Sequence, residues 1–218
     1  MVLPSSRRDK PPTLPGFENI HSMWSPEFNQ WSYKIAPGEY FITKTGEYIT
    51  TVLGSCISAC IRDPQTGIGG MNHFMLPGDN NTKTSKLHGI NTLATRYGVV
   101  AMKTLIHDVI EHGACRDRLE LKLFGGGAVL EMQVNSIGDR NIAFARRFAA
   151  SEGLQIVSED MGGRFARKVN YFPQTGRVMV KRLRAMHKRA IQQTEQTYQI
   201  ALHTNNSAFD LDQINHEN

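Results

Sequence analysis

The chain has 218 residues, of which 40% are hydrophobic, and carries a formal net charge of +5. This length favours one domain with tails over two small domains, and the hydrophobic fraction is enough for a buried core. The mild basic excess permits an acidic partner but does not indicate a nucleic-acid-binding protein.

The three cysteines are Cys56, Cys60 and Cys115, an odd number without a repeating spacing. They favour reduced thiols in a cytosolic protein over a secreted disulfide framework. The N-terminal sequence MVLPSSRRDKPPTLPG lacks the apolar stretch of a signal peptide. An uninterrupted apolar run of about 18 residues is also absent, so we expect a cytoplasmic protein that is not embedded in a membrane.

Three segments are predicted along the chain. Residues 1–37 are rich in proline, serine and charge and are expected to form a flexible N-terminal tail. Residues 38–184 are expected to form the folded domain. Residues 185–218 are predicted to be helix-prone to about Leu202 and disordered beyond it. The aromatic residues of the first segment are interpreted as packing over the domain or, alternatively, as docking on a partner; they are Trp24, Phe28, Trp31 and Tyr33.

Alternating apolar residues predict several strands at the start of the domain. The sequence GEYFITKTGEYITTVLG, residues 38–54, predicts two short strands with a turn at 44–46. SCISACIRD (55–63) and IGGMNHFML (68–76) predict two antiparallel strands, joined by a turn that contains proline and glycine.

The hydrophobic period changes further along the chain. Residues 91–112 and 139–151 have the 3.6-residue period of amphipathic helices, and a glycine follows each of them. Strands are predicted at 119–124 and 154–160, and a final hairpin at 167–183. Hairpins combined with two long helices predict an α+β fold, with packed β-sheets flanked by helices.

The hairpin predicted at 55–76 brings Cys56 close to His73. If the turn is centred between Pro64 and Gln65, these two residues are cross-strand partners, with Cβ atoms about 4.5 to 5.5 Å apart. An imidazole at that distance can accept the proton of a thiol and produce a nucleophilic thiolate. Gly54, two residues before Cys56, leaves room for a substrate to approach the backbone.

Two other interpretations of these residues remain open at this point. A cysteine in a strand is often a small core residue, as we expect for Cys60 and Cys115, and a single histidine is often structural. A metal site is a further alternative, formed by Cys56, Cys60 and His73 with His88 as the fourth ligand. The spacing of its two cysteines is unlike that of zinc sites.

Several motifs together resemble the CheD family of chemoreceptor glutamine deamidases. They occur in the family's order over about residues 38–183. The motifs are LGSC (53–56), MNHF (71–74), KLFGGGA (122–128), IGDRN (137–141), EDMGG (159–163) and YFPQTGRVMV (171–180).

The resemblance implies a fold shared with bacterial toxins that deamidate glutamine in small GTPases. It also implies a catalytic site of Cys56, His73 and Thr50, with Thr51 as the neighbouring alternative for the threonine. No cofactor or metal is expected. The implied reaction is attack of the cysteine on a glutamine side-chain amide, followed by hydrolysis of the thioester.

The implied substrates are methyl-accepting chemotaxis receptors. A CheC-type phosphatase is a further possible partner, and a non-catalytic adaptor is the alternative function. A cysteine protease is a lesser alternative. Residues 140–189 contain twelve Arg or Lys and three Asp or Glu, which can steer docking to an acidic receptor or form an ordinary solvated face. The glycines at 125–127 lack a phosphate-binding motif and are interpreted as a permissive loop near the active site.

Overall fold

The computed structural model describes residues 9–77, 93–128, 137–183 and 188–214. Its strands form two five-stranded sheets. The first sheet has the spatial order β1 (His21–Ser25), β2 (Gln30–Lys34), β4 (Tyr48–Leu53), β9 (Arg167–Phe172) and β10 (Arg177–Arg182). The second has the order β3 (Tyr40–Thr43), β6 (Gly69–Asn72), β5 (Ile57–Arg62), β7 (Glu120–Gly125) and β8 (Gln155–Met161).

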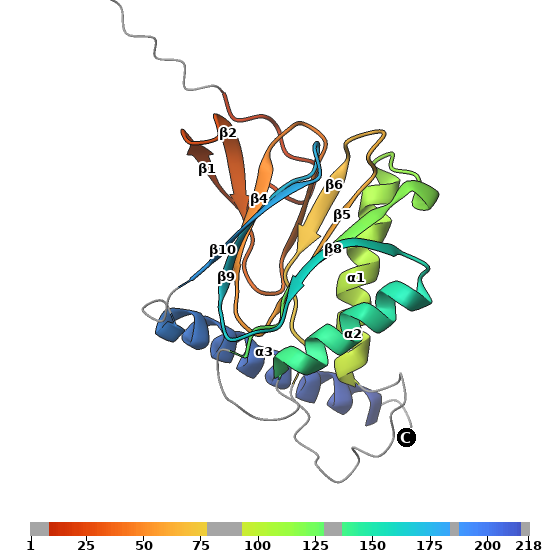
Figure 1. Cartoon of the computed structure of the whole chain (residues 1–218). Coiled ribbons are helices and arrows are strands. Elements are labelled where there is room, and N and C mark those ends of the chain that lie inside the picture. Colours follow the sequence, from red (N-terminus) through yellow and green to blue (C-terminus); the bar gives the residue numbers. More distant parts are fainter. Residues whose placement is uncertain (1–8, 78–92, 129–136, 184–187, 215–218) are drawn as a thin grey trace, which may run out of the picture.

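Both sheets are mixed. The pairs β2–β4 and β7–β8 are parallel, and the other neighbouring strands are antiparallel. The helices are α1 (Leu93–Glu111), α2 (Ile137–Ser151) and α3 (Lys188–Ile214), with a short 3-10 helix at Arg116–Arg118. Helices α1 and α2 pack on the second sheet, and α3 lies across the lower end of the molecule (Figure 1). The predicted α+β class, with packed sheets flanked by helices, is confirmed; the likeness to the toxins stays a prediction.

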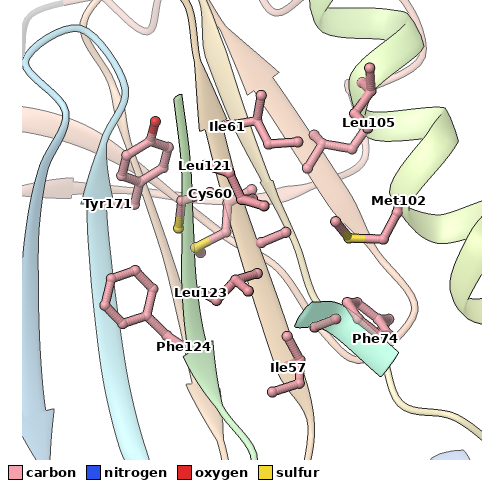
Figure 2. Close-up of a cluster of buried hydrophobic side chains, with 14 of the residues drawn as sticks. Ile57, Cys60, Ile61, Phe74, Met102, Leu105, Leu121, Leu123, Phe124 and Tyr171 are labelled. Atoms are coloured by element: carbon pink, nitrogen blue, oxygen red, sulfur yellow. The ribbon is translucent and has the colours of Figure 1, made fainter. Parts of the chain in front are cut away.

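The core has two parts because successive side chains of β5 point to opposite faces of the second sheet. Ile61 points toward Met102 and Leu105 of α1, whereas Cys60 points toward Tyr171 of the first sheet (Figure 2). All five side chains are completely or almost completely buried. The structure therefore confirms Cys60 as a core residue, and β5 is covered by α1 on one face and by the first sheet on the other.

The strands predicted at 38–54 both form but lie in different sheets. β3 pairs with β6, whereas β4 pairs with β2 and β9. The chain then returns from β4 to β5 of the second sheet through Gly54, Ser55 and Cys56. We call these three residues the crossing loop. Because they belong to neither sheet, their backbone groups are available for other partners.

Ordered structure extends into both predicted tails. Within residues 1–37, β1 and β2 form a hairpin that joins the first sheet, and Tyr33 is completely buried against Phe41. Flexibility was therefore a wrong expectation for residues 21–34, and packing over the domain is confirmed for Phe28, Trp31 and Tyr33. The helix α3 also continues past Leu202 to Ile214. The domain boundaries themselves stay predictions. Among the helices in the described ranges, none combines the length and apolarity needed to cross a membrane.

Candidate active site

Three hydrogen bonds fix the carbonyl groups of the crossing loop. The carbonyl of Gly54 accepts the N–H of Gly127 at 2.7 Å, and the carbonyl of Cys56 accepts the N–H of Gly126 at 2.7 Å. The carbonyl of Ser55 accepts the side-chain amide of Asn141, on α2, at 2.8 Å. The three glycines at 125–127 thus support the loop that carries Cys56, and two of their N–H groups are occupied by this task.

The fixed carbonyls determine where the N–H groups of the loop point. In a trans peptide the C=O and N–H groups point in opposite directions. The carbonyls of Gly54 and Ser55 thus orient the N–H groups of Ser55 and Cys56. Together with the Gly54 N–H, these groups converge on one carboxylate, that of Glu195 on α3, at 3.0, 3.2 and 2.9 Å. The Ser55 hydroxyl donates to the same carboxylate at 2.8 Å. We call these four donors the cradle. Converging backbone donors beside a nucleophile are the arrangement that stabilises an oxyanion.

The register of the β5–β6 hairpin differs from the prediction. Cys60 pairs with Met71, and an isolated bridge joins Ile57 to Phe74. Direct opposition of Cys56 and His73 was therefore wrong. The reason is the length of the turn. It is closed by a hydrogen bond from the Asp63 N–H to the Ile68 carbonyl, which makes it two residues longer than the predicted turn. A shift of two residues preserves the face of each side chain.

Cys56 and His73 each lie just outside a paired strand. β5 begins one residue after Cys56, and β6 ends one residue before His73. The exposed fractions of the two residues are 0% and 2%. The backbone of His73 is fixed because its N–H donates to the Glu39 carbonyl at 2.9 Å and its carbonyl accepts the Gly38 N–H at 2.7 Å.

A hydrogen-bond chain assigns the protons of the His73 ring. The Thr51 hydroxyl donates to the Ile35 carbonyl at 2.8 Å. The same hydroxyl oxygen lies 2.8 Å from Nδ1 of His73. Because the single hydroxyl proton is directed to the carbonyl, the oxygen must accept from Nδ1–H. The lone pair is then on Nε2, which is buried and has no hydrogen-bond partner within the described part of the chain. Nε2 can therefore act as a base.

Thr50 does not contact His73, contrary to the expectation. Its hydroxyl donates to the Asn170 side chain at 2.6 Å. Thr50 and Thr51 are neighbours in β4, and neighbouring side chains of a strand point to opposite faces. The histidine contact belongs to Thr51, the alternative that the sequence left open.

Burial and Glu195 control the ionisation of the two central residues. Burial raises the pKa of the Cys56 thiol well above its usual value, and the Glu195 carboxylate raises it further. Burial lowers the pKa of His73 to about 4, although Glu195 and the Ile35 carbonyl partly oppose this shift. With Glu195 in place, Cys56 is thus a neutral thiol and His73 a neutral imidazole at pH 7.

Three residues of this site were not identified from the sequence. Asn141 lies in the IGDRN motif. Its complete burial, which is unusual for a polar residue on a helix, is seen only in the structure. Ile35 contributes only a backbone carbonyl, for which the sequence holds no signal. Glu195 shares one face of α3 with Tyr198 and Leu202. The signal available in the sequence was an acidic residue on a helix face that also carries apolar residues.

The proposed metal ligands do not assemble into a site in the described ranges. No group of three or more His, Cys, Asp or Glu residues is placed there to hold a metal ion. Cys60 instead points into the core between the sheets (Figure 2). His88 lies outside the described residues.

A cysteine beside converging backbone donors, with a histidine fixed through one nitrogen, is the arrangement found in enzymes of cysteine-dependent acyl transfer. Residues 75–182 match the family model described as CheD chemotactic sensory transduction.

Three relatives carry the name probable chemoreceptor glutamine deamidase CheD. The relative from Hahella chejuensis is 43% identical over 210 residues, covering 95% of this chain and 98% of its own. That from Hydrogenovibrio crunogenus is 52% identical over 168 residues, covering 77% and 85%. That from Halorhodospira halophila is 46% identical over 192 residues, covering 86% and 87%. The chain belongs to the CheD family.

Proposed function

We propose that this protein hydrolyses glutamine side chains of chemoreceptors to glutamate, as the names of its relatives say of them. The observation that carries the proposal is the convergence of the three crossing-loop N–H groups beside Cys56. Such a cradle stabilises the negative oxygen that forms when a nucleophile attacks an amide carbon. The methyl-accepting chemotaxis receptors are the substrate class, and the cytoplasm is the place of reaction.

The proposed reaction has two halves. Nε2 of His73 accepts the thiol proton, and the Cys56 sulfur forms a bond to the amide carbon of glutamine. The imidazolium returns the proton to the amide nitrogen, the C–N bond breaks, and ammonia leaves a thioester. A water molecule, deprotonated by Nε2, then attacks the thioester carbon. The C–S bond breaks, and glutamate and the free thiol are released. Thr51 positions the imidazole throughout.

The contact with Glu195 supports a side-chain amide as substrate over a main-chain amide. A side chain borne on an intact helix reaches the cradle, while the main chain of that helix keeps its own hydrogen bonds. A protease must instead bind an extended main chain next to its nucleophile. This observation favours deamidation over the cysteine-protease alternative. The adaptor function and the binding of a CheC-type phosphatase stay predictions.

Part of the basic excess at 140–189 has structural roles. Arg167 is 2% exposed and donates to the Gly125 and Gly162 carbonyls and to Asp160. Arg146 forms an ion pair with Glu159. Steering of receptors is therefore assigned to the remaining exposed basic residues of this half, such as Lys168 and Lys181.

The proposed function is tested with a chemoreceptor cytoplasmic domain incubated with the wild-type protein or with Cys56→Ala. Peptide mapping should find glutamines that gain about one dalton with the wild-type protein only. Cys60→Ala is the matched control, because this cysteine lies in the core, and it should retain the activity. A receptor that stays unchanged, or that changes equally with Cys56→Ala, would exclude the proposed function; fragments would indicate a protease.

A further inference from the structure

The candidate nucleophile is closed to other proteins in this structure. Cys56 is completely buried and His73 nearly so. A glutamine of a receptor cannot reach either residue unless an element moves away. The N–H side of the crossing loop is contacted by α3, which runs across the lower end of the two sheets (Figure 1). Asn141 of α2 instead bonds the Ser55 carbonyl on the opposite side of the loop.

Glu195 fills the cradle. One carboxylate oxygen accepts the N–H groups of Gly54 and Cys56, and the other accepts the N–H and hydroxyl of Ser55. The residue is 3% exposed. A Cβ atom built on Gly54 would lie 2.8 Å from both carboxylate oxygens, so a side chain at this position would disturb the contact. No second carboxyl or amide group can bind the cradle while Glu195 occupies it.

The chemistry of Glu195 matches that of the proposed product. Glutamine and glutamate side chains have the same length, and the amide oxygen of glutamine can accept the N–H groups of Gly54 and Cys56, as one carboxylate oxygen of Glu195 does. A glutamate on a helix is also what remains when a helix-borne glutamine has been deamidated. Glu195 therefore resembles a bound product that is part of the enzyme itself.

Two further contacts of α3 lie on the same face of the helix as Glu195. Leu202 is buried, and the ring of Tyr198 lies so close to Gly38 that a Cβ atom there would be 2.9 Å from a ring carbon. Gln196 and Thr197 are exposed on the other side. α3 thus binds as a single amphipathic helix, and another helix with a suitably placed glutamine can occupy the same position.

We propose, on the basis of the proposed function, that α3 is an intramolecular inhibitor that holds Glu195 in the substrate position as a tethered product analogue. The active form has α3 displaced by a receptor helix, whose glutamine side chain enters the cradle. The substrate is accordingly a glutamine on an intact helix. Burial, and after it the Glu195 carboxylate, raise the pKa of the Cys56 thiol. Displacement of α3 therefore both opens the site and favours the thiolate.

The test measures the reactivity of Cys56 in the full chain without any substrate. Iodoacetamide labels accessible thiolates, and peptide mapping reports the labelling rate of each cysteine. We expect Glu195→Ala to raise the rate at Cys56 by at least about tenfold, because the covering helix is released and the carboxylate is removed. Gln196→Ala, an exposed neighbour on α3, should leave the rate unchanged. Cys60 should stay unlabelled in every variant if the fold is intact.

Receptor deamidation by the same variants separates this inference from the proposed function. Faster deamidation by Glu195→Ala together with faster labelling supports both. Unchanged labelling of Cys56 in Glu195→Ala overturns the inference, whatever the receptor assay gives. Labelling of Cys60 along with Cys56 overturns it too, because reactivity would then reflect unfolding. Faster labelling of Cys56 alone, with no deamidation by any variant, keeps the covering role of α3 and rejects the proposed function.

Discussion

The hydroxyl proton of Thr51 decides which nitrogen of His73 can act as a base. It is directed to the Ile35 carbonyl, so the threonine oxygen can only accept from Nδ1–H. This leaves Nε2 without a proton and facing no partner among the described residues. In the proposed reaction, this hydroxyl performs the positioning task that a carboxylate performs in Ser-His-Asp triads.

Thr51→Ala should lower kcat for receptor deamidation by at least about tenfold, equivalent to about 1.4 kcal/mol, with little change in KM. The other tautomer of His73, which cannot accept the thiol proton, then becomes accessible. Thr51→Ser keeps the hydroxyl and should restore kcat. Thr50→Ala, which removes the bond to Asn170, should retain kcat within about threefold. The assignment is wrong if Thr50→Ala is the more damaging change.

The buried His73 should also make the stability of the fold depend on pH. Its pKa is about 4 in the folded protein and 6.5 in the unfolded chain. Between these values the unfolded state binds the additional proton, so the free energy of unfolding should fall as pH is lowered from 6.5 to 4, by about 3 kcal/mol in all.

Denaturant unfolding of the wild-type protein and of His73→Gln over this range measures the effect. The free energy of unfolding should depend less steeply on pH in His73→Gln than in the wild-type protein. Asp63 acts in a different window: Arg118 holds its pKa well below the usual range, so its contribution is present above pH 3.8 and is lost below it. Equal slopes in the two proteins between pH 6.5 and 4 would show that His73 is not the titrating group.

At the scale of elements, the glycines at 125–127 fix the orientation of the crossing loop. Gly125 has a φ of 113°, and a Cβ atom there would lie 2.1 Å from the carbonyl oxygen of Cys56. The backbone would have to shift, and with it the N–H groups of the cradle. Misplacement of catalytic groups by about 1 Å can reduce the rate about 100-fold.

We therefore expect Gly125→Ala to reduce deamidation by about 100-fold while the two-sheet fold persists. Gly153→Ala is the matched control. Gly153 also has a positive φ, 65°, but a Cβ atom there meets nothing within 4 Å. The control should lose about 1 to 2 kcal/mol of stability without losing activity. Circular dichroism reports the loss of stability, and the deamidation rate reports the loss of activity. Equal activity in the two variants would show that Gly125 does not orient the crossing loop.

Local patterns predicted most of the elements, while their pairing depended on contacts that patterns do not encode. The alternation in GEYFITKTGEYITTVLG indicated β3 and β4 but could not assign them to different sheets. The turn after Asp63 shifted the register by two residues because its exact length follows from backbone hydrogen bonds. A shift of two residues keeps the face of each side chain. The assignment of Cys56 and His73 to one catalytic site stays a prediction.

At the scale of the whole molecule, both terminal segments contribute to the site. The N-terminal segment supplies the Ile35 carbonyl to Thr51, and α3 supplies Glu195 to the cradle. The composition of these segments predicted tails, because their many polar and charged residues outnumber the few positions that become buried. Glu195 is the clearest case: an acidic residue is rarely buried unless several donors surround it, and those donors come from residues about 140 positions earlier.

The most direct test of the whole account is the intact mass of Glu195→Gln after purification and incubation. This substitution places the proposed substrate group in the cradle, beside Cys56. The account predicts that the side chain at position 195 is converted to glutamate, with a gain of about one dalton that maps to this position and is absent in the double variant with Cys56→Ala. A folded Glu195→Gln chain whose mass stays unchanged would contradict the account.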